Sequence, residues 1–247
     1  MTQAKSVLVT GASRGIGAAI AEQLAELGFV VGCFSRSGAL PDRPDASDKA
    51  RANWVALTGD VTDREAVAGA CATLAERTPL VGVVNNAGLH RTHRASDISI
   101  EEWDQMVSMN VTSVIVGVQC AYPHLVAAGG GLIVNIGSFF DRIGVKRNLA
   151  YCASKAAVAA IGRVLAVEWG AHGIRTLTVA PGYIVTDLNG AAMEDGPLRA
   201  YLARRIPRGE PGSAEEVGRV VAGLFAMDCG FLTGETLYLD GGQGIAH

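Results

Sequence analysis

The sequence alternates short apolar runs with longer, helix-like segments from its first residues almost to its last. The apolar runs are continuous instead of alternating with polar residues, which is typical of strands covered on both faces. Strands that alternate with helices form βαβ units, and these build a doubly wound α/β fold with a parallel sheet between two layers of helices. The expected strands are Ser6–Thr10, Phe29–Phe34, Trp54–Leu57, Leu80–Val84, Leu132–Ile136, Ile174–Val179 and Thr236–Leu239. The expected helices are Ile16–Leu27, Arg64–Glu76, Ile100 to about Leu125, Tyr151–Gly170 and Ala214–Met227.

Two longer stretches interrupt this alternation. Residues 37–52 are rich in Pro, Asp and Ser, which predicts a surface loop. At about residues 186–212, glycines and prolines surround a short helix-like piece, Pro197–Arg204, and a long interruption of this kind is often a lid or a binding loop. Neither stretch resembles a domain linker. The length of 247 residues therefore predicts a single Rossmann-like domain over residues 1–247, with a substrate loop at about 186–212.

Composition excludes some classes of partner. With 21 Lys and Arg against 24 Asp and Glu, the formal net charge is −3, so the chain lacks the basic field that holds a nucleic acid. The densest basic cluster, residues 90–94, is too short to change this. No stretch reads as long and apolar enough to cross a bilayer, and the apolar run Val7–Val9 is too short for a signal peptide. We therefore expect a cytoplasmic protein with no nucleic-acid or membrane partner.

The five cysteines lie far apart, no pair has CxxC spacing, and their number is odd. A disulfide framework or a zinc site is therefore not expected. We predict reduced, mostly buried thiols and no bound metal.

The first expected strand leads into three glycines, Gly11, Gly15 and Gly17, and then into a helix. Glycines at such a turn let the backbone approach a pyrophosphate, and the free N–H groups of the helix N-terminus bind its phosphates. The spacing is not that of the commonest fingerprint, GxGxxG, but the position at the head of the first βαβ unit favours a nucleotide site over a plain glycine turn. The predicted cofactor-binding residues of this loop are Gly11, Ser13, Arg14, Gly15, Ile16 and Gly17.

The end of the second expected strand bears on the choice between NADP(H) and NAD(H). A carboxylate there accepts the ribose hydroxyls of NAD, but this strand ends in Ser35 and Arg36. Arg36 and Arg14 are suited to pairing with a 2′-phosphate, so we predict NADP(H); the alternative is that both are solvated loop residues. After the third strand, Asp60 is a candidate acceptor for the adenine amino group, with Val61 packing on the ring. Asp60 is equally suited to capping the next helix.

Tyr151 and Lys155 stand four residues apart at the start of an expected helix, so they share one face. A free tyrosine has a pKa of about 10, and a nearby ammonium lowers it, which makes the pair a workable general acid/base. The pair alone is unspecific. Ser138, Asn85–Gly88 and Pro181–Gly182, however, all follow expected strands at their carboxyl ends. Ligands of open parallel sheets bind at that edge, so we predict one site that contains all these groups.

Together these motifs resemble those of the short-chain dehydrogenase/reductase family, over nearly the whole chain. The matching segments are Thr10–Gly17, Asn85–Gly88, Asn110, Ser138, Tyr151–Lys155, Pro181–Thr186 and Leu232–Gly242. The resemblance implies a seven-stranded Rossmann sheet and hydride transfer between NADP(H) and a carbonyl compound or secondary alcohol. It also implies a homotetramer or homodimer, often built through the helices that span Asn110–Leu125 and Tyr151–Gly170.

The resemblance further implies residue roles. Tyr151 is the acid/base, Lys155 lowers its pKa and holds the nicotinamide ribose, and Ser138 hydrogen-bonds the substrate carbonyl. Asn110 holds a water that links Lys155 to solvent. The implied contacts to the nicotinamide and to the floor of the cofactor site are Asn86, Ala87, Gly88, Pro181, Gly182, Ile184 and Thr186. This chemistry needs no metal and no covalent intermediate.

Two other functions stay open at this point. One is an NAD-dependent alcohol or sugar dehydrogenase of the same family, against which Ser35 and Arg36 argue. The other is a nucleotide-binding regulator without chemistry, which is disfavoured because such proteins usually lack one catalytic residue.

The branch that the chain resembles most contains the 3-oxoacyl-carrier-protein reductases, by its glycine loop and its C-terminal tail. Those reductases often carry an arginine that docks the carrier just before the glutamate of the catalytic helix, whereas here Val167 precedes Glu168. The segment Ala127–Gly131 also lacks the basic residues often found there. These departures argue against a carrier protein and favour a small-molecule carbonyl or alcohol substrate.

A few residues bear on the substrate. Phe139 and Phe140 beside the catalytic serine suggest an apolar pocket wall. Arg142 could meet an anionic substrate, and His90 and His93 could rim the pocket. For these three residues, an exposed surface position is the favoured interpretation.

Overall fold

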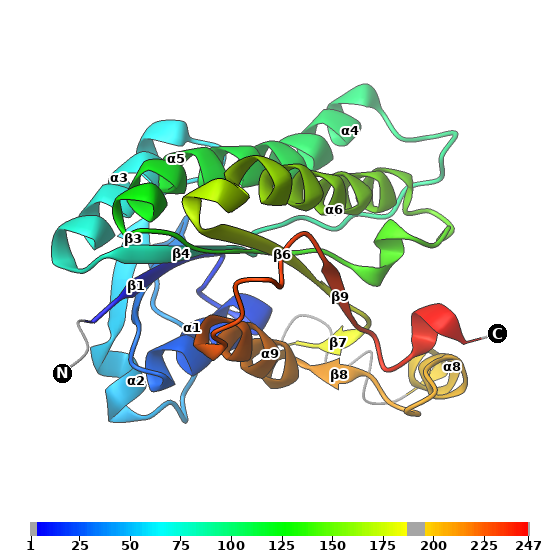
Figure 1. Ribbon diagram of the computed structural model, residues 1–247. Coiled ribbons are helices and arrows are strands. Elements are labelled where there is room, and N and C mark those ends of the chain that lie inside the picture. Colours follow the sequence, from blue (N-terminus) through cyan, green and yellow to red (C-terminus); the bar gives the residue numbers. More distant parts are fainter. Residues whose placement is uncertain (1–3, 187–195, 247) are drawn as a thin grey trace.

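The computed structural model describes residues 4–186 and 196–246. Their strands form a seven-stranded parallel sheet in the order β3-β2-β1-β4-β5-β6-β9 and a separate two-stranded pair, β7-β8 (Figure 1). The strands of the large sheet are β1 Ser6–Thr10, β2 Val30–Ser35, β3 Trp54–Thr58, β4 Leu80–Asn85, β5 Gly131–Ile136, β6 Ile174–Pro181 and β9 Thr236–Leu239. The strand order reverses between β1 and β4, the place where sheets of this type bind ligands. The predicted doubly wound α/β fold is confirmed.

Helices cover both faces of the sheet, and the sheet separates them into two layers (Figure 1). One layer contains α1 Gly15–Glu26 and α9 Ala214–Ala226, with the short helix α2 Asp48–Ala52 beside α1. The other layer contains α3 Arg64–Arg77, α5 Ser113–Ala127 and α6 Leu149–Trp169.

The central strand β1 shows why its sequence is apolar throughout. Successive side chains of a strand point to opposite faces, so Val7 and Val9 pack in the core cluster with α1 and α9. Leu8 packs in the opposite cluster, with α3 and α5. All three side chains are fully buried, and burying an aliphatic side chain of this size stabilises the fold by about 1.5–3 kcal/mol. A strand with a helix on each face therefore has no solvated side on which a polar residue would be favoured.

Most predicted elements are confirmed with their ends shifted by one or two residues, but one predicted helix is interrupted. The single helix expected from Ile100 to about Leu125 is α4 Ile100–Val107, a π-helical segment Ser108–Thr112, and then α5. The apolar residues continue through the break, so the hydrophobic pattern does not reveal it. The interruption places Asn110 at a wide turn, and such turns often mark functional sites.

The sequence predicted that residues 37–52 form a surface loop, but part of this stretch is helical. Its last residues form α2, whose N-cap Ser47 accepts a hydrogen bond from the backbone N–H of Ala50 at 3.0 Å. Ser47 is followed by Asp48 in the first turn, a combination that favours a helix start. The neighbouring prolines and aspartates obscured this signal.

After β6, the chain forms β7 Ile184–Val185, and later the helix α8 Pro197–Arg205 and the strand β8 Gly212–Ser213. The predicted helix-like piece Pro197–Arg204 is confirmed as α8. The proposed substrate loop at about 186–212 includes residues 187–195, which lie outside the described residues. Its role as a loop over the substrate stays a prediction.

One segment corrects the sequence-based expectation that no stretch is long and apolar enough to cross a membrane. Leu149–His172 passes that test by length and composition, with a mean hydropathy of 1.4. This segment is α6 and the turn after it, and α6 packs on β6. Val158 and Leu165 belong to the core cluster of that face, so its apolar character has a place in the packing.

The cysteines follow the prediction of unpaired, mostly buried thiols. All five are free, and Cys33, Cys71 and Cys120 are buried. Burial raises the pKa of Cys33 and of Cys71 to about 12, so both remain protonated at neutral pH.

Two glycines of α9 provide a matched test of the packing between α1 and α9. A Cβ at the buried Gly218 would lie 2.7 Å from the backbone oxygen of Ala19 in α1, whereas a Cβ at the exposed Gly223 would meet nothing within 4 Å. We expect Gly218→Ala to lower the free energy of unfolding by about 1–3 kcal/mol through overpacking. Gly223→Ala should raise it by about 0.5–1 kcal/mol, because alanine favours the helix. Urea denaturation measures both, and equal effects of the two substitutions would contradict this packing.

Candidate active site

The glycine loop after β1 is held in a shape that only glycine allows. Gly11 and Gly15 have positive φ angles of 66° and 55°. A Cβ at Gly17 would lie 2.1 Å from the backbone oxygen of Gly11, so α1 approaches the loop more closely than any side chain permits. The N-cap residue of α1 is Arg14, whose side chain makes no capping hydrogen bond, and the first turn carries no acidic residue. The N–H groups of this turn are therefore available to an anion, as a dinucleotide pyrophosphate requires.

The loop after β4 is fastened to the glycine loop by two side chains. The hydroxyl of Thr10 accepts hydrogen bonds from the backbone N–H groups of Asn86 and Ala87, at 3.0 and 3.1 Å. The amide of Asn86 donates in return to the backbone oxygens of Thr10 and Gly11, at 2.9 and 3.2 Å. Sequence reasoning placed Thr10 at the end of a strand and in the matching segment Thr10–Gly17 but missed this role, which depends on a contact between distant segments.

A cleft with a volume of about 1460 Å³ runs along the carboxyl ends of the strands, over both loops. It collects most of the predicted cofactor-binding residues, namely Gly11, Ser13, Arg14, Gly15, Ile16, Gly17, Ser35, Arg36, Asp60, Val61, Asn86, Ala87, Gly88 and Thr186. The other five, Tyr151, Lys155, Pro181, Gly182 and Ile184, line a second cavity of about 350 Å³. The two spaces share the lining residues Ile16, Asn86, Gly88, Leu89 and Thr186, so they adjoin.

The far end of the cleft carries the two predicted arginines and one carboxylate. Arg14 and Arg36 are exposed and line the cleft. Asp60 accepts from the backbone N–H and the hydroxyl of Thr62, at 2.9 and 2.7 Å, and these bonds together with the charge of Arg36 lower its pKa. The N-cap of α3 is Asp63, so Asp60 does not cap this helix, and its contact with the adenine amino group stays a prediction.

The segment that follows β2 also borders the cleft, which sequence reasoning had not predicted. Residues 39–42 line it, and the backbone N–H of Asp42 donates to the oxygen of Ser13 at 2.8 Å. Farther along, Arg43 pairs with Glu22 of α1 at 2.7 Å and with Glu215 of α9 at 2.6 Å. These contacts join segments far apart in the sequence, so no local pattern announces them.

The second cavity brings together Ser138, Tyr151 and Lys155. Ser138 follows β5, and α6 places Tyr151 and Lys155 one turn apart on the face that meets the sheet. The ammonium of Lys155 donates to the backbone oxygen of Ile136 at 2.8 Å and lies 5.7 Å from the centre of the Tyr151 ring. A nucleophilic or acid/base group at this depth has its pKa set by its few neighbours.

Burial dominates the electrostatics of this pair. It raises the pKa of Tyr151, and a hydrogen bond with Ser138 acts in the opposite direction. Burial also lowers the pKa of Lys155 from 10.5 to about 8. Ser138 is the neighbour that favours the tyrosinate in this structure, and the expectation that Lys155 also lowers the pKa of Tyr151 stays a prediction.

Asn110 links the second cavity to the loop after β4. Its side-chain oxygen accepts from the N–H of Leu89 at 2.7 Å, and its amide donates to the oxygen of Leu89 at 2.9 Å. The same amide donates to the hydroxyl of Ser154 in α6 at 3.1 Å. Asn110 thus fixes α6 against this loop, and its predicted role in holding a water stays a prediction.

The wall of the second cavity is aromatic, as Phe139 and Phe140 predicted. Both are buried, and the ring of Phe140 meets that of Tyr151 nearly at right angles, with 5.9 Å between centroids. Arg142 is not directed to a substrate, because it pairs with Asp240 at 3.3 Å and stacks 3.6 Å above the ring of Tyr238. Arg142 is exposed, which confirms the interpretation that favoured a surface position.

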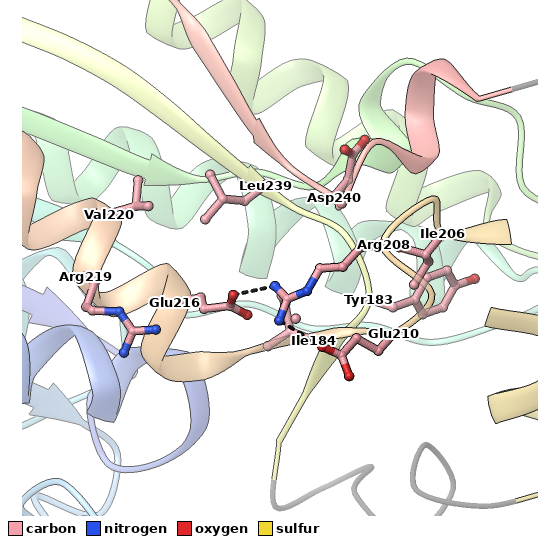
Figure 2. Close-up of a pocket in the computed structure, with 12 residues that line it drawn as sticks. Tyr183, Ile184, Ile206, Arg208, Glu210, Glu216, Arg219, Val220, Leu239 and Asp240 are labelled. Carbon is pink, nitrogen blue, oxygen red and sulfur yellow. Dashed lines mark hydrogen bonds and ion pairs between the residues drawn. The ribbon is translucent and has the colours of Figure 1, made fainter. Parts of the chain in front are cut away.

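A third cavity, of about 430 Å³, lies on the other side of Tyr183 and Ile184 (Figure 2). Three of its charged side chains pair with one another: Arg208 lies between Glu210 and Glu216 and forms an ion pair with each (Figure 2). Of the predicted site residues, only Ile184 lines it. Among the described residues, no group of three His, Cys, Asp or Glu side chains could hold a metal ion. The predicted catalytic residues Ser138, Tyr151 and Lys155 lie in the cavity of Tyr151 instead.

Comparisons with known proteins agree with this geometry. A family model described as "Enoyl-(Acyl carrier protein) reductase" matches residues 11–243. The chain is 32% identical over 238 residues to a 2-dehydro-3-deoxy-D-gluconate 5-dehydrogenase of Bacillus subtilis, covering 96% of this chain and 94% of that protein. It is 35% identical over 247 residues to the 3-oxoacyl-[acyl-carrier-protein] reductase FabG of Haemophilus influenzae, covering 97% and 98%. Among solved structures, a gluconate 5-dehydrogenase from Burkholderia cenocepacia in complex with NADP and tartrate superimposes with a TM-score of 0.87, at 28% identity over 99% and 96% of the two chains.

The lowered pKa of Lys155 predicts a pH dependence of stability. The folded protein disfavours the charged lysine, so this cost is fully present below pH 8 and disappears as pH rises from about 8 to 10.5. Lys155→Met has no such charge, so its free energy of unfolding relative to the parent should fall by about 3 kcal/mol across that window. Denaturation at several pH values measures the slope, with Lys5→Met as an exposed control. A difference independent of pH would contradict a desolvated Lys155.

Proposed function

This chain belongs to the short-chain dehydrogenase/reductase family of oxidoreductases, and we propose that it transfers a hydride between NADP(H) and a small ketone or secondary alcohol. The observation that carries this proposal is the junction of the two spaces. The cleft over the glycine loop and the cavity of Tyr151 share five lining residues, so a dinucleotide in the first places its reactive end beside the second.

The glycine loop supports the nucleotide part of the proposal. Its close approach to α1 and the uncapped N-terminus of that helix fit a pyrophosphate. Arg14 and Arg36 line the same cleft and suit a 2′-phosphate, which favours NADP(H) over NAD(H). The solved relative with bound NADP supports the same choice.

The residues of the second cavity divide the proton chemistry between them. Tyr151 donates its phenolic proton to the carbonyl oxygen during reduction and takes it back during oxidation. Ser138 hydrogen-bonds both the phenol and the carbonyl oxygen, and so orients the substrate. When bound, the nicotinamide supplies or accepts the hydride. A lysine with a pKa of about 8 exchanges protons near neutral pH, so Lys155 can restore the proton of Tyr151.

The size of the second cavity supports a small substrate. Its volume of about 350 Å³ is at the lower end of ligand pockets in proteins. Val167, which stands where related carrier-protein reductases often have an arginine, is 86% exposed on α6. An apolar, exposed position offers no charge to an acidic carrier, so we propose a free small molecule as the substrate.

We also propose that the chain assembles as a homodimer or homotetramer through α5 and α6. Val126 of α5 and Val164 and Val167 of α6 are exposed, at 40%, 53% and 86%. Exposed apolar side chains on two helices of one layer favour a surface that another subunit covers.

Fluorescence titration of the purified protein with NADPH and NADH tests the cofactor. We expect tighter binding of NADPH, and Arg14→Ala or Arg36→Ala should weaken it roughly 10- to 100-fold, because each removes a charge-assisted bond to the 2′-phosphate. The affinity for NADH should change little. Arg77→Ala, an exposed arginine at the end of α3, is the control. Tighter binding of NADH, unaffected by either arginine, would refute NADP(H) as the cofactor.

A further inference from the structure

The ring of His90 lies directly against the catalytic tyrosine. Its centroid is 4.5 Å from that of Tyr151, with 61° between the ring planes, which is an edge-to-face contact. His90 also lines the cavity of Ser138 and Tyr151 and is exposed to it. The only other ring against Tyr151 among the described residues is Phe140, so His90 is the one aromatic neighbour of Tyr151 whose ring carries nitrogen atoms.

A buried asparagine holds this ring. Nε2 of His90 lies 2.6 Å from the side-chain oxygen of Asn148, and Asn148 is 7% exposed. Asn148 is the N-cap residue of α6, but its side chain does not cap the helix. Asparagine is among the best N-caps, so its side chain has been diverted from the helix to the histidine.

The backbone beside Asn148 is strained in a way that supports this arrangement. Arg147 has a φ of 67°, which is the only positive φ of a non-glycine residue in the described parts of the chain. The oxygen of Arg147 accepts from the N–H of His93 at 2.9 Å, which ties the segment after β4 to the segment before α6. Strain of this kind persists mainly where the surroundings or the function require it.

The hydrogen bonds of Asn148 determine which nitrogen of His90 carries the proton. The amide nitrogen of Asn148 donates to the oxygen of Lys146 at 2.9 Å, so its side-chain oxygen faces His90 and acts as an acceptor. Nε2 of His90 must then be the donor, and in the neutral imidazole Nδ1 is left with a free lone pair. Among the described residues, Nδ1 has no hydrogen-bond partner.

We propose that His90 is a specificity-determining residue that accepts a hydrogen bond at Nδ1 from a hydroxyl group next to the reacting carbon of the substrate. An acceptor selects a donor, so it favours a hydroxyl and disfavours both an aliphatic substituent and an acceptor-only carboxylate. The preferred substrates are then α-hydroxyketones and the corresponding polyols. This inference rests on the proposed function and narrows its substrate class.

Two ketones of similar size test the inference. Hydroxyacetone carries a hydroxyl where butan-2-one carries a methyl group, and NADPH oxidation gives kcat/KM for each. We expect the parent protein to prefer hydroxyacetone, and His90→Phe to reduce that preference roughly 5- to 10-fold, the value of one hydrogen bond. Phenylalanine keeps an aromatic ring against Tyr151 but removes both nitrogens. His93→Phe is the control, because His93 pairs with Glu102 and lines neither cavity.

A second readout does not require turnover. In protein labelled with ¹⁵N at histidine and carrying Tyr151→Phe, the ¹⁵N spectrum should show His90 protonated at Nε2. Its Nδ1 resonance should shift on addition of hydroxyacetone but not of butan-2-one. His90→Phe assigns the signal.

The two readouts separate failure of this inference from failure of the proposed function. Reduction of both ketones with a preference unchanged by His90→Phe, or a His90 protonated at Nδ1, overturns the inference and leaves the function intact. A preference for pyruvate over hydroxyacetone that is lost in His90→Phe would also overturn it, because it would make the imidazole a donor. A hydroxyl-dependent ¹⁵N shift without reduction of either ketone supports the hydroxyl contact and counts against the proposed function.

Discussion

The structure depends on the close approach of three backbone segments at the carboxyl ends of β1 and β4. They are the glycine loop, the first turn of α1 and the loop after β4. The oxygen of Gly11 occupies the space that a Cβ at Gly17 would need. The amide of Asn86 donates to that same oxygen, and the hydroxyl of Thr10 accepts hydrogen bonds from two backbone N–H groups of the loop after β4. Because these groups lie at the reversal of strand order, the clamp fixes both the start of α1 and the floor of the cleft. These contacts shape the nucleotide site, and they also position the loop that carries His90.

The chemistry depends on a different condition, the removal of ionisable side chains from water. Tyr151 and Lys155 lie in a small cavity with aromatic walls, and burial favours the neutral form of each. A tyrosine with a raised pKa stays protonated at neutral pH, so its proton is present when a carbonyl compound binds, although the same shift makes the phenol a weaker acid. The pKa of Lys155 is brought close to neutral pH, where the lysine can exchange protons. Burial thus favours a protonated Tyr151 beside a lysine that can gain and lose a proton.

The order of strands and helices, the glycine loop and the Tyr151–Lys155 pair could be predicted from the sequence, because each depends on local pattern or spacing. The break at Asn110 could not, since the apolar pattern passes through it unchanged. The clamp of Thr10 and the contact of Asp42 with Ser13 join segments that only the fold brings together. For His90, the sequence favoured a plain exposed surface position over the pocket rim; the residue is exposed, but it also lines the cavity, where Asn148 fixes it against Tyr151.

In the proposed reaction, Tyr151 supplies the proton while the cleft holds the nucleotide independently. Tyr151→Phe keeps the ring and its packing and removes only the hydroxyl, so it separates the two. Single-turnover oxidation of NADPH by this variant, with a ketone that the parent protein reduces, is the most direct measurement. We expect a loss of roughly 100- to 10,000-fold in rate, the usual contribution of a positioned acid, with NADPH affinity retained. Undiminished turnover would show that another group donates the proton and would contradict the account.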